Sequence, residues 1–186
     1  LAALGDLAGS GSLANLTHLN LDHNQIGDAV MSEFSRAIAS GSLSNLSSLI
    51  LDDNQMGDAG MIAFAEALKP TDKLPMGSLG SLKELWLESN QIGDAGMKEF
   101  SAAIASGALG KLKELYLSDN QIGDECAKAI AAVLKDSKLS ELGCAASRSH
   151  DPTHPMCQPP LNTYTLPASD AVCATTSLAT RAGLRS

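Results

Sequence analysis

The sequence predicts an α/β solenoid of stacked strand, turn and helix units, followed by a disordered C-terminal tail. Two observations predict this fold. The pattern LxLxxN, followed closely by Gly-Asp, is present four times, and its asparagines are Asn24, Asn54, Asn90 and Asn120. A repeat at a nearly fixed period indicates stacked units rather than one closed core. From residue 143 onward the chain is rich in Pro, Ser, Thr and Ala, and this composition indicates disorder.

The spacing of the copies also predicts one loop. Successive asparagines are 30, 36 and 30 residues apart. The longer interval contains the segment 69–76, KPTDKLPM, whose prolines and aspartate favour a turn-rich loop between a helix and the next strand.

Each copy begins with a predicted strand. In the fourth copy, Leu115 and Leu117 alternate with Glu114, Tyr116 and Ser118. Because successive strand residues point to opposite faces, the leucines share one face and the variable residues share the other. We therefore assign the leucines to the core.

A turn and a helix follow each predicted strand. Gly123 favours the turn, and Asp124 is a candidate N-cap whose carboxylate would accept hydrogen bonds from free amides at the start of a helix. In the preceding copy Gly107 marks the helix end. Before it, apolar residues recur at helical spacing, at Met97, Phe100 and Ile104. Each helix therefore buries one stripe behind the sheet, and stability depends on contacts between neighbouring units.

These copies resemble leucine-rich repeats, and the unit with GDAG resembles the ribonuclease-inhibitor-like class. The resemblance covers residues 1–142. It implies a right-handed solenoid with a curved parallel sheet on the concave face and helices on the convex face, in which the asparagines bond backbone groups of adjacent turns. The opening residues LAALGDLAGSGSLANL match the end of a repeat, so we expect a fragment of about four and a half repeats from a longer array.

The variable strand positions form the candidate binding face, since solenoids of this type bind partners on their concave surface. This face comprises positions 18, 20, 22 and 23 in the first copy and the equivalent four positions in each of the other copies. These positions include seven acidic residues and neither Lys nor Arg. The only tryptophan and one of the two tyrosines share one position in adjacent copies. The predicted partner-binding residues are Asp22, Asp52, Asp53, Glu84, Trp86, Glu88, Glu114, Tyr116 and Asp119. The alternative is that a generally acidic surface shows acids everywhere and that the two rings stack only to stabilise the sheet.

Charge and motifs restrict the function. Residues 1–142 hold 10 Lys or Arg and 19 Asp or Glu, a net of −9, which disfavours nucleic acids and anionic membranes as main partners. We find no catalytic motif and predict no cofactor. The sequence favours a non-catalytic scaffold that binds a protein with a basic patch. The alternatives are a regulatory arm of a GTPase activator or of a nucleotide-binding immune-type receptor, which the resemblance implies, and a spacer within a larger receptor.

The tail, residues 143–186, departs from the pattern. The last apolar residues of the pattern are Leu134, Leu139 and Leu142, which follow Ile104, Leu109 and Leu112 by 30 residues. Because no further strand leucine comes after Leu142, no strand is expected there. Either further repeats are missing or the tail has another origin. The tail contains four candidate zinc ligands, Cys144, His150, His154 and Cys157. Their spacing matches no standard zinc finger. A single cysteine in residues 1–142 suits a reducing compartment, and we expect a cytoplasmic protein.

Overall fold

The computed structural model describes residues 13–123 and 141–143, together with positions 126, 130 and 133. Five parallel strands of three residues each form one sheet in chain order. They are β1 (His18–Asn20), β2 (Ser48–Ile50), β3 (Glu84–Trp86), β4 (Glu114–Tyr116) and β5 (Glu141–Gly143).

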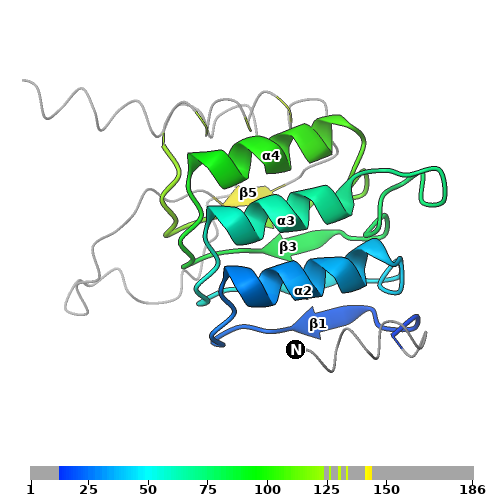
Figure 1. The fold of residues 1–186 in the computed structure, drawn as a ribbon, viewed down its shortest axis with the longest axis horizontal. Helices are drawn as coiled ribbons and strands as arrows, with labels where there is room; N and C mark the ends of the chain where they lie inside the picture. Colours follow the sequence, from blue (N-terminus) through cyan, green and yellow to red (C-terminus); the bar gives the residue numbers. More distant parts are fainter. Residues whose placement is uncertain (1–12, 124–125, 127–129, 131–132, 134–140, 144–186) are drawn as a thin grey trace, which may run out of the picture.

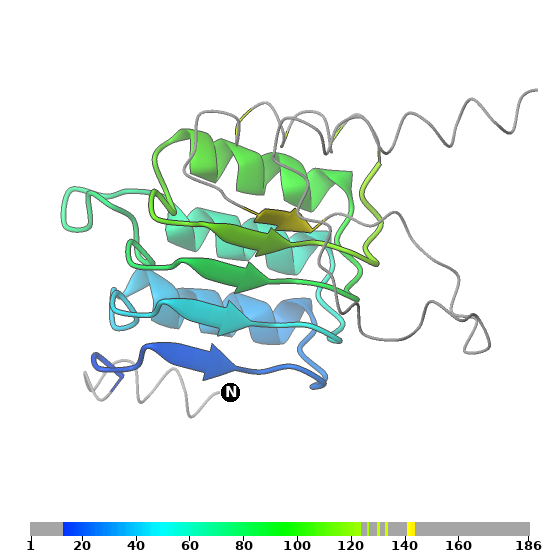
Figure 2. The same cartoon turned by 180° about the vertical axis from the view of Figure 1, so that it is seen from behind.

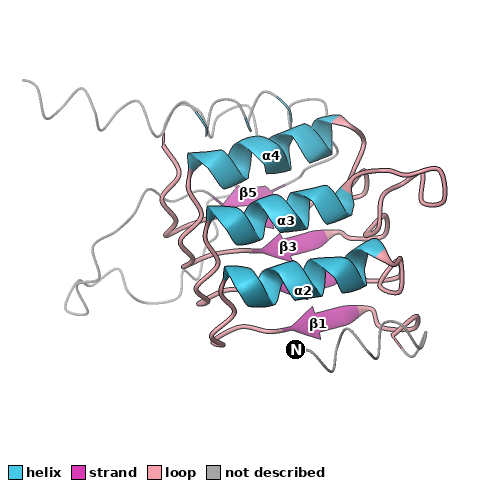
Figure 3. Cartoon of the chain, viewed as in Figure 1, coloured by secondary structure: helices cyan, strands magenta, loops and turns pink. Residues whose placement is uncertain are grey.

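Three helices connect the first four strands and lie on one side of the sheet (Figures 1 and 3). They are α2 (Asp28–Ala39), α3 (Asp58–Leu68) and α4 (Asp94–Ala105). Seen from behind, the strands lie in front and the helices behind them (Figure 2). This order of strand, turn and helix confirms the predicted α/β solenoid.

The core fills the layer between the sheet and the helices. The leucines of β2, β3 and β4 are buried as predicted, and Leu85 and Leu115 have an exposed fraction of 0%. Leu19 of β1 is only partly buried. From the helix side, Phe64 and Phe100 stack with ring centroids 6.3 Å apart. Because these rings belong to α3 and α4, the apolar layer is continuous from one repeat to the next.

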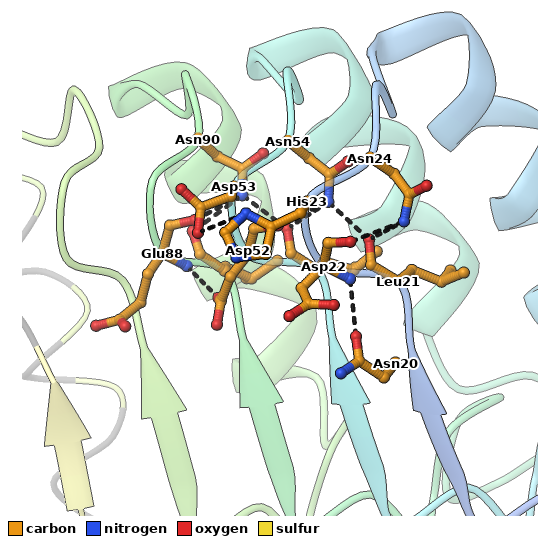
Figure 4. A network of polar contacts seen from close by, with 12 residues as sticks. Asn20, Leu21, Asp22, His23, Asn24, Asp52, Asp53, Asn54, Glu88 and Asn90 are labelled. Atoms are coloured by element: carbon orange, nitrogen blue, oxygen red, sulfur yellow. Dashed lines mark hydrogen bonds and ion pairs between the residues drawn. The ribbon is translucent and has the colours of Figure 1, made fainter.

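From the second copy onward, the asparagines of the pattern join neighbouring repeats through hydrogen bonds, whereas Asn24 donates to Leu21 and Asp22 in its own turn (Figure 4). The side-chain amide of Asn90 donates to the carbonyls of Leu87 at 3.3 Å and Glu88 at 3.0 Å in its own turn. The same amide donates to the carbonyl of Leu51 in the preceding repeat at 2.9 Å, and its oxygen accepts from the Met56 backbone N–H at 3.1 Å. Asn54 and Asn120 repeat this arrangement, which confirms the structural role predicted for the asparagines.

In the described repeats, the aspartate of Gly-Asp accepts hydrogen bonds at the start of the next repeat's helix and is not the N-cap residue of its own helix. Asp124 lies outside the described residues, but its equivalents Asp28, Asp58 and Asp94 are the first residues of their helices. The N-cap positions are glycines that make no side-chain cap bond. The carboxylate of Asp58 accepts backbone bonds of 2.8 Å from Gly93 and Gly96, at the start of α4.

From the second copy onward, the glycine before the aspartate is needed for space rather than for a special turn conformation. Gly57 and Gly93 have φ of −100° and −106°, which any residue adopts. A Cβ on Gly93 would lie 3.0 Å from a carboxylate oxygen of Asp58. The aspartate of one repeat therefore leaves room only for a small residue in the next.

The second glycine of GDAG lets neighbouring helices approach closely. A Cβ on Gly96 would lie 2.8 Å from the Met61 Cβ and 2.9 Å from an Asp58 carboxylate oxygen. The first copy has Val30 at this position, and the described residues include no helix before α2 that would contact it. The fourth copy has Cys126 there, and among the described residues Asp94 accepts a cap bond only from Gly123.

The sheet extends further than the sequence predicts. Leu142 pairs with Leu115 in the register of β4 and β5, so its alignment with Leu112 is wrong. These two leucines are 27 residues apart (142 minus 115), which is a shorter interval than between the other copies. The repeat pattern therefore did not predict the fifth strand. Gly143, the first residue of the predicted tail, belongs to β5, and residues 144–186 lie outside the described part of the chain.

Replacing Gly96 with alanine should destabilise the solenoid by about 1 to 3 kcal/mol, because overpacking outweighs the helix propensity gained. Gly27→Ala is the matched control, since its Cβ would meet only a backbone oxygen at 3.8 Å. Urea unfolding followed by circular dichroism measures both variants. Equal stability of Gly96→Ala and the wild type would contradict the close approach of the helices.

Candidate functional site

The side chains opposite the helices form what we call the outer sheet face, made by residues of β1 to β4 and of the turns that follow them. Strand register aligns these residues in rows across the sheet. The central row is Asn20, Ile50, Trp86 and Tyr116, and the row before it is His18, Ser48, Glu84 and Glu114. In the described part of the chain no helix covers this face (Figure 2).

Trp86 and Tyr116 lie against each other in the central row. Their ring centroids are 4.2 Å apart and the ring planes are tilted by 35°. Both side chains are half-buried. The indole N–H of Trp86 is buried and has no hydrogen-bond acceptor among the described residues, so packing rather than a hydrogen bond holds the ring. The Tyr116 hydroxyl donates to a carboxylate oxygen of Glu114 at 3.4 Å.

A row of carboxylates follows the central row at the carboxyl ends of the strands, formed by Asp22, Asp52 and Glu88 (Figure 4). Backbone pairing continues there, since the N–H of Leu51 donates to the Trp86 carbonyl at 2.9 Å. The Asp52 carboxylate accepts from the Glu88 backbone N–H at 2.7 Å and is thereby fixed between two repeats.

One position further, Asp53 lies 3.4 Å from a ring nitrogen of His23 in the neighbouring repeat. Both side chains are exposed. The pair therefore lies at the solvent-exposed edge of the row of carboxylates.

The structure brings all nine predicted binding residues onto the outer sheet face or its carboxyl edge. Asp53 and Asp119 are exposed and the other seven are half-buried. Lys83 and Lys113 directly precede β3 and β4 and are exposed, so cationic groups border the opposite, amino edge. Acidic character is therefore strongest at the carboxyl edge.

Comparison with known proteins agrees with this geometry. A family model described as Leucine Rich repeat matches residues 12–34, 42–65, 81–101 and 111–131. The chain is a leucine-rich-repeat protein. A solved structure described as Leiomodin-1 Actin-Binding Site 2 (ABS2) is 19% identical, with a TM-score of 0.59 over 77% of this chain and 78% of that one. No curated protein matches the chain.

The leucine-rich-repeat family and the exposed sheet support a protein-binding scaffold. Among the described residues, none of the helices combines the length and the hydropathy that a membrane span needs. Within the same described residues, no group of three or more His, Cys, Asp or Glu side chains is arranged to hold a metal ion. The cysteines and histidines considered for zinc in the tail lie outside the described residues.

Burial raises the pKa of Asp52 from 3.8 to about 6. The Glu88 backbone amide stabilises the ionised form and opposes this shift, while the carboxylates of Glu88, Asp53 and Asp22 add to it. The leucine-rich-repeat stacking therefore holds like charges together at the carboxyl edge, where the pKa of Asp52 is raised to about 6.

Sequence reasoning missed the backbone conformation at this edge. The residue before each asparagine has a left-handed φ of 50° to 55°, at His23, Asp53, Ser89 and Asp119. Asp and His tolerate this conformation better than most residues. Their repeated choice before asparagine was a usable signal for the turn. The contact between His23 and Asp53 follows from the same turn geometry.

Asp52→Asn should stabilise the protein at pH 7.5 by about 1 kcal/mol, after discounting for the half-exposed position of Asp52. Because the folded pKa of Asp52 lies above 3.8, the native state binds this proton more tightly than the unfolded chain does. The contribution of Asp52 to the stability of the folded state is therefore present at low pH and is lost as the pH rises through about 6. The asparagine oxygen can still accept from Glu88.

Thermal unfolding of both forms from pH 4 to pH 8 measures this effect. The difference in Tm should be largest above pH 6 and smallest near pH 4. Asp72→Asn, an exposed change in the loop 69–76, is the control. A variant less stable than the wild type at pH 7.5 would contradict the cost of burial and charge repulsion assigned to ionised Asp52.

Proposed function

We propose that this leucine-rich-repeat protein is a non-catalytic scaffold whose outer sheet face binds a protein with a basic patch. The observation that carries the proposal is the half-buried pair of Trp86 and Tyr116, in the central row between Glu84 and Glu114 on one side and Asp52 and Glu88 on the other. Aromatic anchors surrounded by polar groups are typical of residues that dominate binding energy.

Charge supports a basic partner. Seven acidic residues and no Lys or Arg occupy the sixteen positions of the outer sheet face and its carboxyl edge, four from each of four repeats. Carboxylates concentrated on one surface steer a cationic partner and penalise an acidic one. The rings then supply the apolar area that charge alone lacks.

The structural relative supports the coarser part of the proposal. That relative is described as an actin-binding site, so its fold is compatible with binding a protein. At 19% identity the likeness extends to the fold alone. The chemistry of the partner is therefore inferred from the outer sheet face of this chain.

Trp86→Ala combined with Tyr116→Ala should abolish capture of the partner, because truncating two interface anchors costs a few kcal/mol, or at least about tenfold in affinity. The measurement is a pull-down from lysate at two salt concentrations, with mass spectrometry of the retained proteins. A basic protein should be retained by the wild type, less so at high salt, and lost with the double variant.

Met76→Ala is the matched control, since Met76 is an apolar residue 51% exposed in the loop between α3 and β3. This variant should behave as the wild type. Equal retention of the same proteins by the wild type and the double variant would contradict the proposed site. Retention that is insensitive to salt would contradict the basic partner.

A further inference from the structure

Two rows of the outer sheet face differ in chemistry. The apolar row is Ile50, Trp86 and Tyr116 on β2, β3 and β4. The acidic row is Asp22, Asp52 and Glu88, two residues further along β1, β2 and β3. Residues two apart along a strand are about 6.6 Å apart, so the two rows run side by side across the strands.

The spacing along each row fits a helix. Neighbouring strands are about 4.8 Å apart, so each row offers one side chain at about that interval. A helix lying across the strands presents one side chain per turn on the same face, with a pitch of about 5.4 Å. An extended chain presents its same-face side chains about 6.6 Å apart and loses register within three strands.

The charges set which side of that helix is basic. The acidic row and Asp53 lie at the carboxyl edge of the sheet, whereas at the amino edge Glu84 and Glu114 are each preceded by a lysine, Lys83 and Lys113. A helix with its apolar stripe on the apolar row therefore gains most from Lys or Arg on the flank that faces Asp52 and Glu88.

We propose that the outer sheet face binds a basic amphipathic helix of a protein partner, which lies across β1 to β4. Its apolar side chains contact Ile50 and Trp86, and its cationic side chains pair with Asp52 and Glu88. The inference rests on the proposed function and names the shape of the partner that function requires. Amphipathic helices bind grooves through apolar residues repeated at every turn, and the apolar row supplies the matching contacts.

Trp86 makes the proposal measurable. It is the only tryptophan of the chain, so its fluorescence reports this face alone. Its indole N–H has no acceptor among the described residues, and its ring is held by packing against Tyr116. A helix docked on the apolar row changes the polarity around the ring and shields it from acrylamide.

The experiment titrates the full chain with three synthetic peptides that lack tryptophan, each about 15 residues long, or about four helical turns. The first has a leucine stripe flanked by lysines on one side. The second has the same composition with a central proline, which breaks the helix. The third has glutamate in place of lysine. Tryptophan fluorescence and acrylamide quenching give the Kd values, and the first peptide should bind at least tenfold more tightly than the others.

The combined variant Asp52→Asn, Glu88→Gln should weaken the lysine peptide at least tenfold, and Glu84→Gln, at the amino side of Trp86, should weaken it less. Both keep the shapes of the side chains, and circular dichroism checks folding. If the proline peptide binds as tightly as the lysine peptide, the helical shape of the partner is overturned, while the proposal of a basic partner stands. Equal binding of the glutamate peptide overturns both proposals. No fluorescence response to any peptide overturns the helix.

Discussion

The structure depends on the buried asparagine that joins each repeat to the one before it. Asn54 and Asn90 have exposed fractions of 7%, and each uses its amide hydrogens and its oxygen on four backbone groups. A buried amide left without partners costs about 1 to 3 kcal/mol, so each asparagine holds two turns in one relative position. Strand register follows from that position, and the rows of the outer sheet face follow from the register.

A second polar contact maintains the spacing at the helix side. The aspartate that begins one helix accepts the first amides of the next, where its negative charge also complements the helix dipole. Glycines at the two facing positions make room for it. These contacts are internal to the stack, and the side chains of the outer sheet face are therefore available for binding.

Much of the fold could be predicted from local patterns. The alternation of Leu115 and Leu117 with polar residues was enough to predict a strand with one buried face, and the helical spacing of Met97 and Phe100 predicted α4. The partner of the aspartate could not be predicted, because Asp58 contacts Gly93 across 35 positions of sequence. The fifth strand was missed because its unit is shorter than the others.

For the candidate site, the rows could be predicted because strand periodicity and a fixed repeat length determine them. The raised pKa of Asp52 could not, since it depends on burial and on carboxylates from three repeats.

Hydrogen exchange tests the central role of the asparagines most directly. In Asn90→Ala, the Met56 amide loses its acceptor and should exchange about tenfold or more faster, while the Ile26 amide, bonded to Asn54, should keep its rate. Unchanged protection of Met56 would contradict the account.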